Sequence, residues 1–209
     1  MNAMKVILRA THTRGAEICV IDNSSHRLNK VSKEVNARYI DTDQDLFNYF
    51  SELMGIFVER NNKKYSYVED GFDDQEIYEK MKEFPPIFIF ISDLMTFLDM
   101  VYNPDKSVGN MSGFFENICE KGSLHNIYLI SCYNIDDYSK LTDYKAFYQL
   151  TSYKKGLHCG GNLANQRMYN FSNISYQEQG KTLKPGIAYT PSSEDDSIGL
   201  KVVLPLVRG

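Results

Sequence analysis

The sequence contains no run of about 18 apolar residues and no secretory leader, so we expect this chain neither to cross nor to enter a membrane. It also contains no C-x-x-C pair, and no histidine lies at metal-ligand spacing from a pair of cysteines, which argues against a zinc site. The four cysteines are therefore interpreted as free thiols in a reducing compartment. Cys19 and Cys132 lie in apolar stretches, where a buried structural thiol is the simplest interpretation.

Basic residues are too scattered for a surface that tracks nucleic acid. The net charge is −4, and Lys63-Lys64 and Lys154-Lys155 are isolated pairs, so we expect no nucleic-acid partner. Hydrophobic residues make up 43% and charged residues 24% of the chain, which is ordinary for a globular protein. A chain of 209 residues is long enough to bury one sizeable core.

The most informative stretch that is present runs from Pro85 to Leu94. Its apolar residues 87–91 do not alternate with polar ones, which is typical of a strand buried on both faces of a parallel sheet. The strand leads to Asp93, and ligands of open α/β sheets bind beyond the carboxyl ends of the strands. Asp93 is therefore a candidate Mg²⁺ ligand. It is equally a candidate N-cap for the helix predicted over residues 94–101.

Two absences around this strand limit its chemistry. The chain has no G-x-x-x-x-G-K-[ST] phosphate loop, and the residue after Asp93 is Leu94, where many ATPases carry a catalytic glutamate. The sequence thus predicts a nucleotide-binding architecture whose catalytic parts are incomplete.

Alternating strands and helices predict a single α/β domain over residues 1–209. The patterns predict helices over residues 1–12, 42–58, 73–84, 94–101, 114–121, 143–150 and 165–171, and strands over 16–22, 38–40, 87–91, 126–131, 157–160, 186–190 and 199–204. Thr42 is the predicted cap of the long helix, which a polar segment, residues 61–71, follows. Asp22, at the end of the first strand, could bind groups on the nucleotide side, but an acid that leads from a strand into a polar loop is more often solvated, and we predict that here.

The order of these elements resembles the RecA-like ATPase domains of FtsK/SpoIIIE proteins. In that comparison, residues 1–12 are the helix after the phosphate loop, 87–93 are the Walker B strand and 126–134 the sensor strand. Residues 160–173 (GGNLANQRMYNFSN) and 176–190 (YQEQGKTLKPGIAYT) are similar to the C-terminal ATPase domain of the EssC/YukB coupling proteins of type VII secretion. The resemblance implies a RecA-like P-loop NTPase fold with a mostly parallel central sheet flanked by helices. The phosphate loop is absent from this chain.

The resemblance also implies site residues and a biological setting. Asp93 would be the Mg²⁺-side carboxylate, Asn134 the polar residue of the sensor strand and Arg167 the arginine on the nucleotide side. The family binds Mg·ATP, although this chain lacks a complete site for it. The chain would be a degenerate domain of a larger multi-domain protein, anchored by its other parts at the cytoplasmic face of the bacterial cell membrane. Its partners would be neighbouring ATPase domains and secreted WXG-type substrates and effectors.

The implied function is substrate recognition and regulation in a secretion motor, and two alternatives stay open. One is an active ATP-hydrolysing motor domain whose phosphate loop was truncated. The other is a DNA-translocating relative of FtsK, which the acidic net charge disfavours. The simpler interpretation of Arg167 is a surface or ion-paired arginine. Gly160-Gly161-Asn162 resembles half of a phosphate nest, but a tight strand-to-helix turn is the favoured interpretation.

Overall fold

The structure, a computed structural model, describes residues 1–12, 15–22, 25–104 and 109–207. Its elements follow in the order α1 (Asn2–His12), β1 (Glu17–Ile21), α2 (Asn29–Glu34), β2 (Arg38–Ile40), α3 (Asp43–Glu69), α4 (Asp74–Met81), β3 (Ile87–Ile91), α5 (Leu94–Tyr102), α6 (Ser112–Lys121), η1 (Gly122–His125), β4 (Ile127–Ser131), η2 (Ile135–Asp137), α7 (Tyr138–Leu141), α8 (Lys145–Thr151), β5 (His158–Cys159), η3 (Leu163–Asn165), α9 (Tyr176–Gln179), β6 (Ile187–Pro191) and β7 (Gly199–Val203). Within these ranges, no helix is both long and apolar enough to cross a lipid bilayer.

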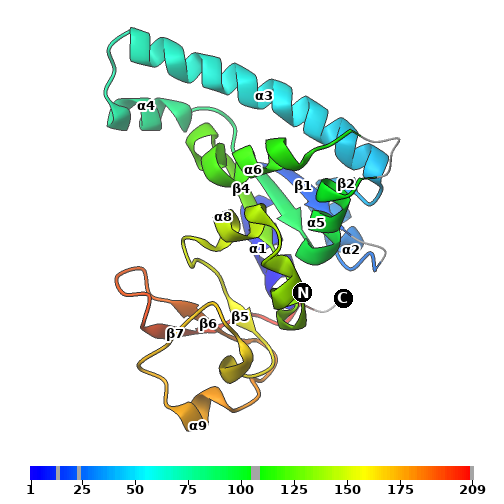
Figure 1. The fold of residues 1–209 in the computed structure, drawn as a ribbon, viewed down its shortest axis with the longest axis vertical. Helices are drawn as coiled ribbons and strands as arrows, with labels where there is room; N and C mark the ends of the chain where they lie inside the picture. The colour runs from blue at the N-terminus through cyan, green and yellow to red at the C-terminus, as the bar shows by residue number, and fades with distance from the viewer. Residues whose placement is uncertain (13–14, 23–24, 105–108, 208–209) are drawn as a thin grey trace.

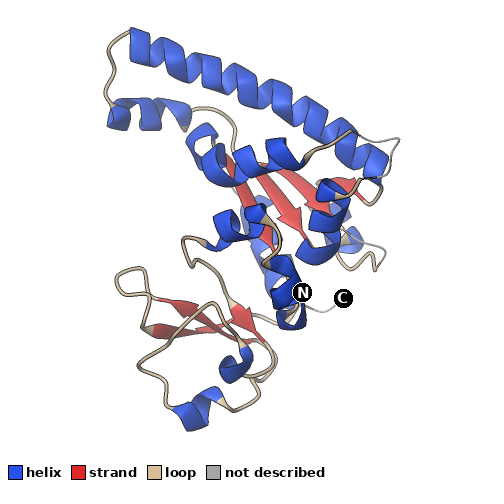
Figure 2. Cartoon of the chain, viewed as in Figure 1, coloured by secondary structure: helices blue, strands red, loops and turns tan. Residues whose placement is uncertain are grey.

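A parallel sheet forms the centre of the fold, with strand order β2-β1-β3-β4 (Figure 1). Successive side chains of a strand point to opposite faces, so each strand supplies two cores. In β3, Ile89 and Ile91 pack with α3, α5, α6 and α8, whereas Phe90 packs on the other face with α1 and α2. Helices therefore cover both faces (Figure 2), which confirms the predicted fold class and the buried strand.

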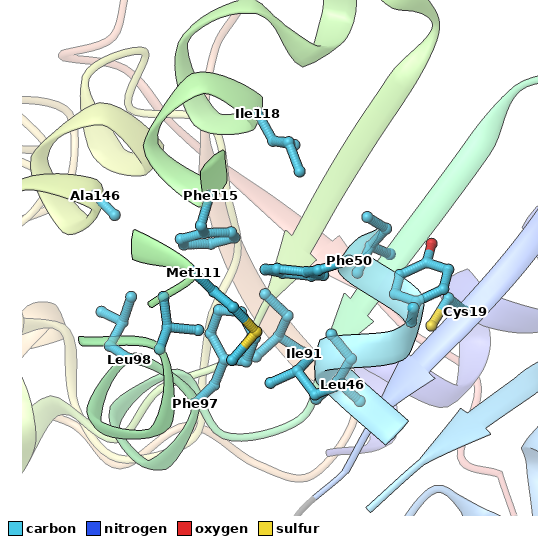
Figure 3. Close-up of a cluster of buried hydrophobic side chains, with 14 of the residues drawn as sticks. Cys19, Leu46, Phe50, Ile91, Phe97, Leu98, Met111, Phe115, Ile118 and Ala146 are labelled. Carbon is cyan, nitrogen blue, oxygen red and sulfur yellow. The ribbon is translucent and has the colours of Figure 1, made fainter. Parts of the chain in front are cut away.

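Aromatic side chains from three helices meet in the larger core. Phe50 of α3 stacks on Phe115 of α6 at a centroid distance of 6.1 Å, and Phe97 of α5 meets Phe115 edge-on at 4.8 Å (Figure 3). Such pairs add about 0.5–1.5 kcal/mol each beyond their burial. Cys19 lies in the same core, and burial raises the pKa of its thiol to about 12, as expected of an inert structural thiol.

Side-chain caps fix the starts of the two helices before β3. Thr42 Oγ1 accepts a hydrogen bond from the Asp45 backbone N–H at 3.2 Å, as predicted. Asp73 and Glu76 form a reciprocal capping box at the start of α4. Each cap satisfies backbone donors that the first turn leaves without partners.

The long helix continues beyond its predicted end at residue 58. It extends to Glu69, through most of the polar segment, and projects past the sheet (Figure 1). Just beyond the predicted end lies a buried Arg60, whose guanidinium donates to the backbone oxygens of His125 at 2.6 Å and Pro85 at 2.8 Å and so anchors α3 at this point. A charged residue thus ties α3 to the segments before β3 and β4 by hydrogen bonds that hydrophobic periodicity does not detect.

The predicted helix over residues 165–171 is wrong. Only the short turn η3 forms there, and the chain then wraps around Gln166. The Gln166 side chain accepts from the backbone N–H groups of Met168 at 2.8 Å and Tyr169 at 2.6 Å, and donates to Tyr169 O at 2.6 Å. These bonds compete with helical ones.

The last third of the chain forms a second lobe with an antiparallel sheet of order β5-β6-β7. The three strands predicted near the C-terminus therefore form a separate sheet and do not extend the parallel one. A small core of Leu163, Phe171, Ile174 and Tyr189 supports this lobe.

Candidate functional site at the carboxyl edge of the parallel sheet

The carboxyl ends of β1, β3 and β4 meet at one edge of the sheet because the strands are parallel. Asp22, Asp93 and Asn134 follow these three strands. The backbone N–H of Leu94 donates to Cys132 O at 2.8 Å, which ties the segment after β3 to the segment after β4. The edge therefore brings Asp93 and Asn134 to the same side of the molecule, where ligands of open α/β sheets bind.

Asp93 is the N-cap of α5. Its Oδ1 accepts from the Thr96 backbone N–H at 3.3 Å and its Oδ2 from Thr96 Oγ1 at 3.1 Å. Of the two roles considered for Asp93, the structure therefore contains the cap.

Leu94 is 1% exposed and belongs to the larger core. The residue after Asp93, where the resemblance leads us to expect a catalytic glutamate in an active ATPase, therefore faces the interior. An apolar side chain in the core can neither accept a proton nor orient a water molecule.

Asn134 and Arg167 lie in different parts of the molecule. Asn134 is exposed and caps η2 by accepting from the Asp136 backbone N–H at 3.3 Å. Arg167 is exposed in the irregular segment of the second lobe, at the turn that Gln166 organises. Asp93 and Asn134 therefore follow neighbouring strands at one edge of the sheet, whereas Arg167 lies in the second lobe.

Asp22 is buried at 5% exposure, so the prediction that it is solvated is wrong. Its Oδ2 accepts from the Leu28 backbone N–H at 2.8 Å and from the Tyr39 hydroxyl at 3.2 Å. Burial, followed by the Asp22 carboxylate, holds the pKa of Tyr39 above its usual value. The Tyr39 hydroxyl also lies 3.1 Å from His26 Nδ1. This carboxylate therefore fastens the loop after β1 to β2.

The glycines after β5 form a tight turn. Gly160 and Gly161 have φ angles of +78° and +57°, a region that favours glycine. They reverse the chain between β5 and η3, where Asn162 caps the next turn by accepting from the Asn165 backbone N–H at 3.1 Å. Of the two interpretations, the strand-to-helix turn accounts for this geometry.

The described residues do not by themselves fit Mg·ATP. Mg²⁺ in such sites is held by one or two carboxylates together with the phosphates of the nucleotide. The edge offers Asp93, whose two oxygens already accept hydrogen bonds from Thr96 and cap α5. The sequence also supplies no phosphate loop to cradle the phosphates.

A surface cavity outside this edge has no counterpart in the sequence motifs. It has a volume of about 250 Å³, lies between α6 and α8, and is lined by Cys119, Glu120, Tyr148, Gln149, Ser152 and Tyr153. The residues come from two separate segments, so no local spacing could have joined them. The abundance of tyrosine was the only available signal.

No family model matches this sequence, and no curated protein matches it. Among solved structures, the cytoplasmic domain of EssC matches with a TM-score of 0.77 at 15% identity, covering 99% of this chain and 37% of that one. A structure of ATPases 2 and 3 of EssC from Geobacillus thermodenitrificans matches with a TM-score of 0.72 at 16% identity, covering 99% of this chain and 34% of that one.

ATPases 2 and 3 of EccC from Thermomonospora curvata, in complex with a signal sequence peptide, match with a TM-score of 0.68 at 11% identity, covering 100% of this chain and 35% of that one. This chain therefore spans little more than a third of each of these chains. It has the RecA-like fold of the EssC and EccC ATPase domains of type VII secretion.

Proposed function

We propose that residues 1–209 act as a single degenerate ATPase domain of the FtsK/SpoIIIE type, which recognises exported proteins in a type VII secretion motor. The observation that carries the proposal is the carboxyl edge of the sheet. There, Asp93 caps a helix and Leu94 is buried in the core. An ATPase-like fold without a general base or a phosphate loop is better suited to binding a partner than to hydrolysing ATP.

The EccC structure supports the partner in this proposal, because it holds a signal sequence peptide on ATPase domains of this fold. We infer that this chain binds the helical signal of secreted WXG-type proteins or effectors and packs against a neighbouring ATPase domain. The larger protein would hold it at the cytoplasmic face of the membrane. Asp93, Asn134 and Arg167 would be the remnants of a nucleotide site.

Titration of a purified WXG-type protein into this chain tests the proposal. Biolayer interferometry with the chain immobilised should give saturable binding, which a variant of the exported protein without its signal segment should lose. A DNA duplex of equal concentration serves as the control and should not bind at physiological salt. Absence of binding by this chain, and also by a tandem that includes its neighbouring domain, would refute the proposed function.

A further inference from the structure

The strongest unassigned feature of the molecule is an exposed apolar stripe along α3. Four large side chains of this helix, Met54, Val58, Tyr65 and Val68, are between 47% and 61% exposed. The part of the helix that carries Tyr65 and Val68 projects past the sheet (Figure 1). An apolar surface of this kind on a folded chain marks a place where another surface docks.

The spacing of these side chains is that of a coiled-coil seam. In a heptad repeat lettered a to g, Val58 and Tyr65 occupy position a, and Met54, Asn61 and Val68 occupy position d. These five residues, which we call the α3 seam, therefore face one side of the helix over a length of about 21 Å. A partner helix can lie along the whole of this length.

Neither the sheet nor α4 covers the α3 seam. The residues of α3 that are buried in the body of the domain, such as Leu53 and Arg60, belong to a different face of the helix. Tyr67, whose ring meets Phe72 ahead of α4 at a centroid distance of 5.8 Å, lies on the side of the helix opposite Tyr65. The seam is thus open to a second molecule.

The polar residues in and beside the seam indicate which partner fits. The Asn61 side chain makes no hydrogen bond among the described residues. Lys64 occupies position g and Glu69 position e, and neither forms an ion pair within 4.0 Å in the described part of the chain. The electrostatic neighbour of Lys64 is His125, whose pKa is lowered by burial and then by Lys64. Glu69 therefore still lacks a cation.

We propose that the α3 seam packs on the α3 seam of a second copy of this chain, as a parallel two-stranded coiled coil. In that arrangement the residue at g of one helix meets the residue at e, five positions further on, of the other. Lys64 then meets Glu69 of the second copy, and Glu69 meets its Lys64. The two Asn61 amides face each other and can pair by hydrogen bonds, a contact that specifies register in coiled coils.

Other arrangements satisfy fewer of these groups. An antiparallel copy pairs g with g and e with e, so Lys64 and Glu69 do not meet. An unrelated apolar helix leaves Asn61 without a partner. The contact between two copies is isologous, since the same surface is used twice. The inference concerns assembly and is independent of the proposed function.

Sedimentation equilibrium of the full chain tests the proposal. The seam spans only two heptads, so we expect weak association, with an average mass that rises from that of a monomer towards that of a dimer over about a hundredfold range of concentration. Tyr65→Glu should raise the dissociation constant at least about tenfold, because two carboxylates would enter the seam. Tyr176→Glu, the same change at a tyrosine that is 86% exposed in the second lobe, should leave it unchanged.

Reversal of the charges tests the parallel register. Lys64→Glu and Glu69→Lys should each weaken the dimer roughly threefold or more, because each places like charges opposite one another. The double variant Lys64→Glu/Glu69→Lys should restore the affinity. Circular dichroism spectra of all variants should match that of the unmodified chain, since the substituted side chains lie outside the core.

A chain that stays monomeric at every concentration would overturn the inference. A dimer that responds equally to Tyr65→Glu and Tyr176→Glu would show that the α3 seam is not its interface. Failure of the double variant to restore the affinity lost in the single variants would refute the parallel register. A monomer that binds an exported protein through Tyr65 would identify a different occupant and would overturn the inference as well.

Discussion

The role of Asp93 gives the sharpest prediction about the candidate site. If this carboxylate acts as a helix cap, Asp93→Ala should lower the free energy of unfolding by about 1 kcal/mol, because the Thr96 backbone N–H and hydroxyl both lose their acceptor. Asp93→Asn should cost less than about 0.5 kcal/mol, since asparagine caps as well as aspartate does. In a chain of this length, the alanine variant should melt about 2–4 °C lower.

Urea unfolding followed by circular dichroism measures both variants, and Asp73→Ala at the capping box of α4 is the matched control with the same expected cost. Thermal melts with and without Mg·ATP complete the assay. The reasoning would be refuted if Asp93→Asn were as destabilising as Asp93→Ala. It would equally fail if Mg·ATP raised the melting temperature of the unmodified chain but not of the Asp93 variants, since ligand stabilisation reports binding to the native state.

Three further predictions concern the fold. Burial, with Lys64 as the next cause, lowers the pKa of His125 to about 4, so between about pH 6.5 and pH 4 the unfolded state binds more protons than the folded state. The free energy of unfolding should therefore decrease as the pH is lowered through that range. In His125→Phe, the urea midpoint should depend less on pH across the same range. Arg60→Met should lower the free energy of unfolding, measured in urea, by about 2–4 kcal/mol, because two backbone carbonyl oxygens lose a charged donor. The control Arg38→Met, at a surface ion pair with Glu52, should lower it by less than about 1 kcal/mol, and equal losses would contradict the anchoring role of Arg60. Gly122→Ala should lower the melting temperature, because a Cβ at this position would lie 3.0 Å from the backbone oxygen of Ile127. Gly55→Ala in α3, where a Cβ would meet nothing within 4 Å, should raise the melting temperature. A higher melting temperature for Gly122→Ala would contradict the close contact between residue 122 and Ile127.

The strands of the parallel sheet and the starts of its helices could be predicted from the sequence because the patterns that indicate them lie within a few neighbouring residues. The unbroken apolar strand over residues 87–91, the cap at Thr42 and the acidic start of α4 each reflect interactions within a few residues. The covering of both faces then followed from the strand composition alone. The resemblance of the distal segment identified the ATPase fold, which the solved structures confirm.

The features that the sequence missed depend on contacts between distant segments. Arg60 reaches carbonyl oxygens 25 and 65 residues away, and no periodicity reveals such a contact. The Gln166 side chain accepts hydrogen bonds from nearby backbone N–H groups, and these bonds form in place of the helix predicted there. A prediction that averages helix propensity over a window of residues does not detect the effect of one such side chain. Asp22 is buried because Tyr39 and the Leu28 N–H satisfy it, although its position in sequence favours solvent. The cavity between α6 and α8 exists only once those helices pack.

Calorimetric titration of Mg·ATP, followed by a turnover assay, tests the central claim most directly. The titration should be run on this chain and on one extended upstream by about 30–40 residues, enough to supply a strand and phosphate loop of a βαβ-like unit. The account predicts no turnover by either form, because the buried Leu94 cannot act as a general base, and no measurable binding by the shorter one. Mg²⁺-dependent turnover by the extended form that Asp93→Ala abolishes would contradict the account and identify an active motor domain.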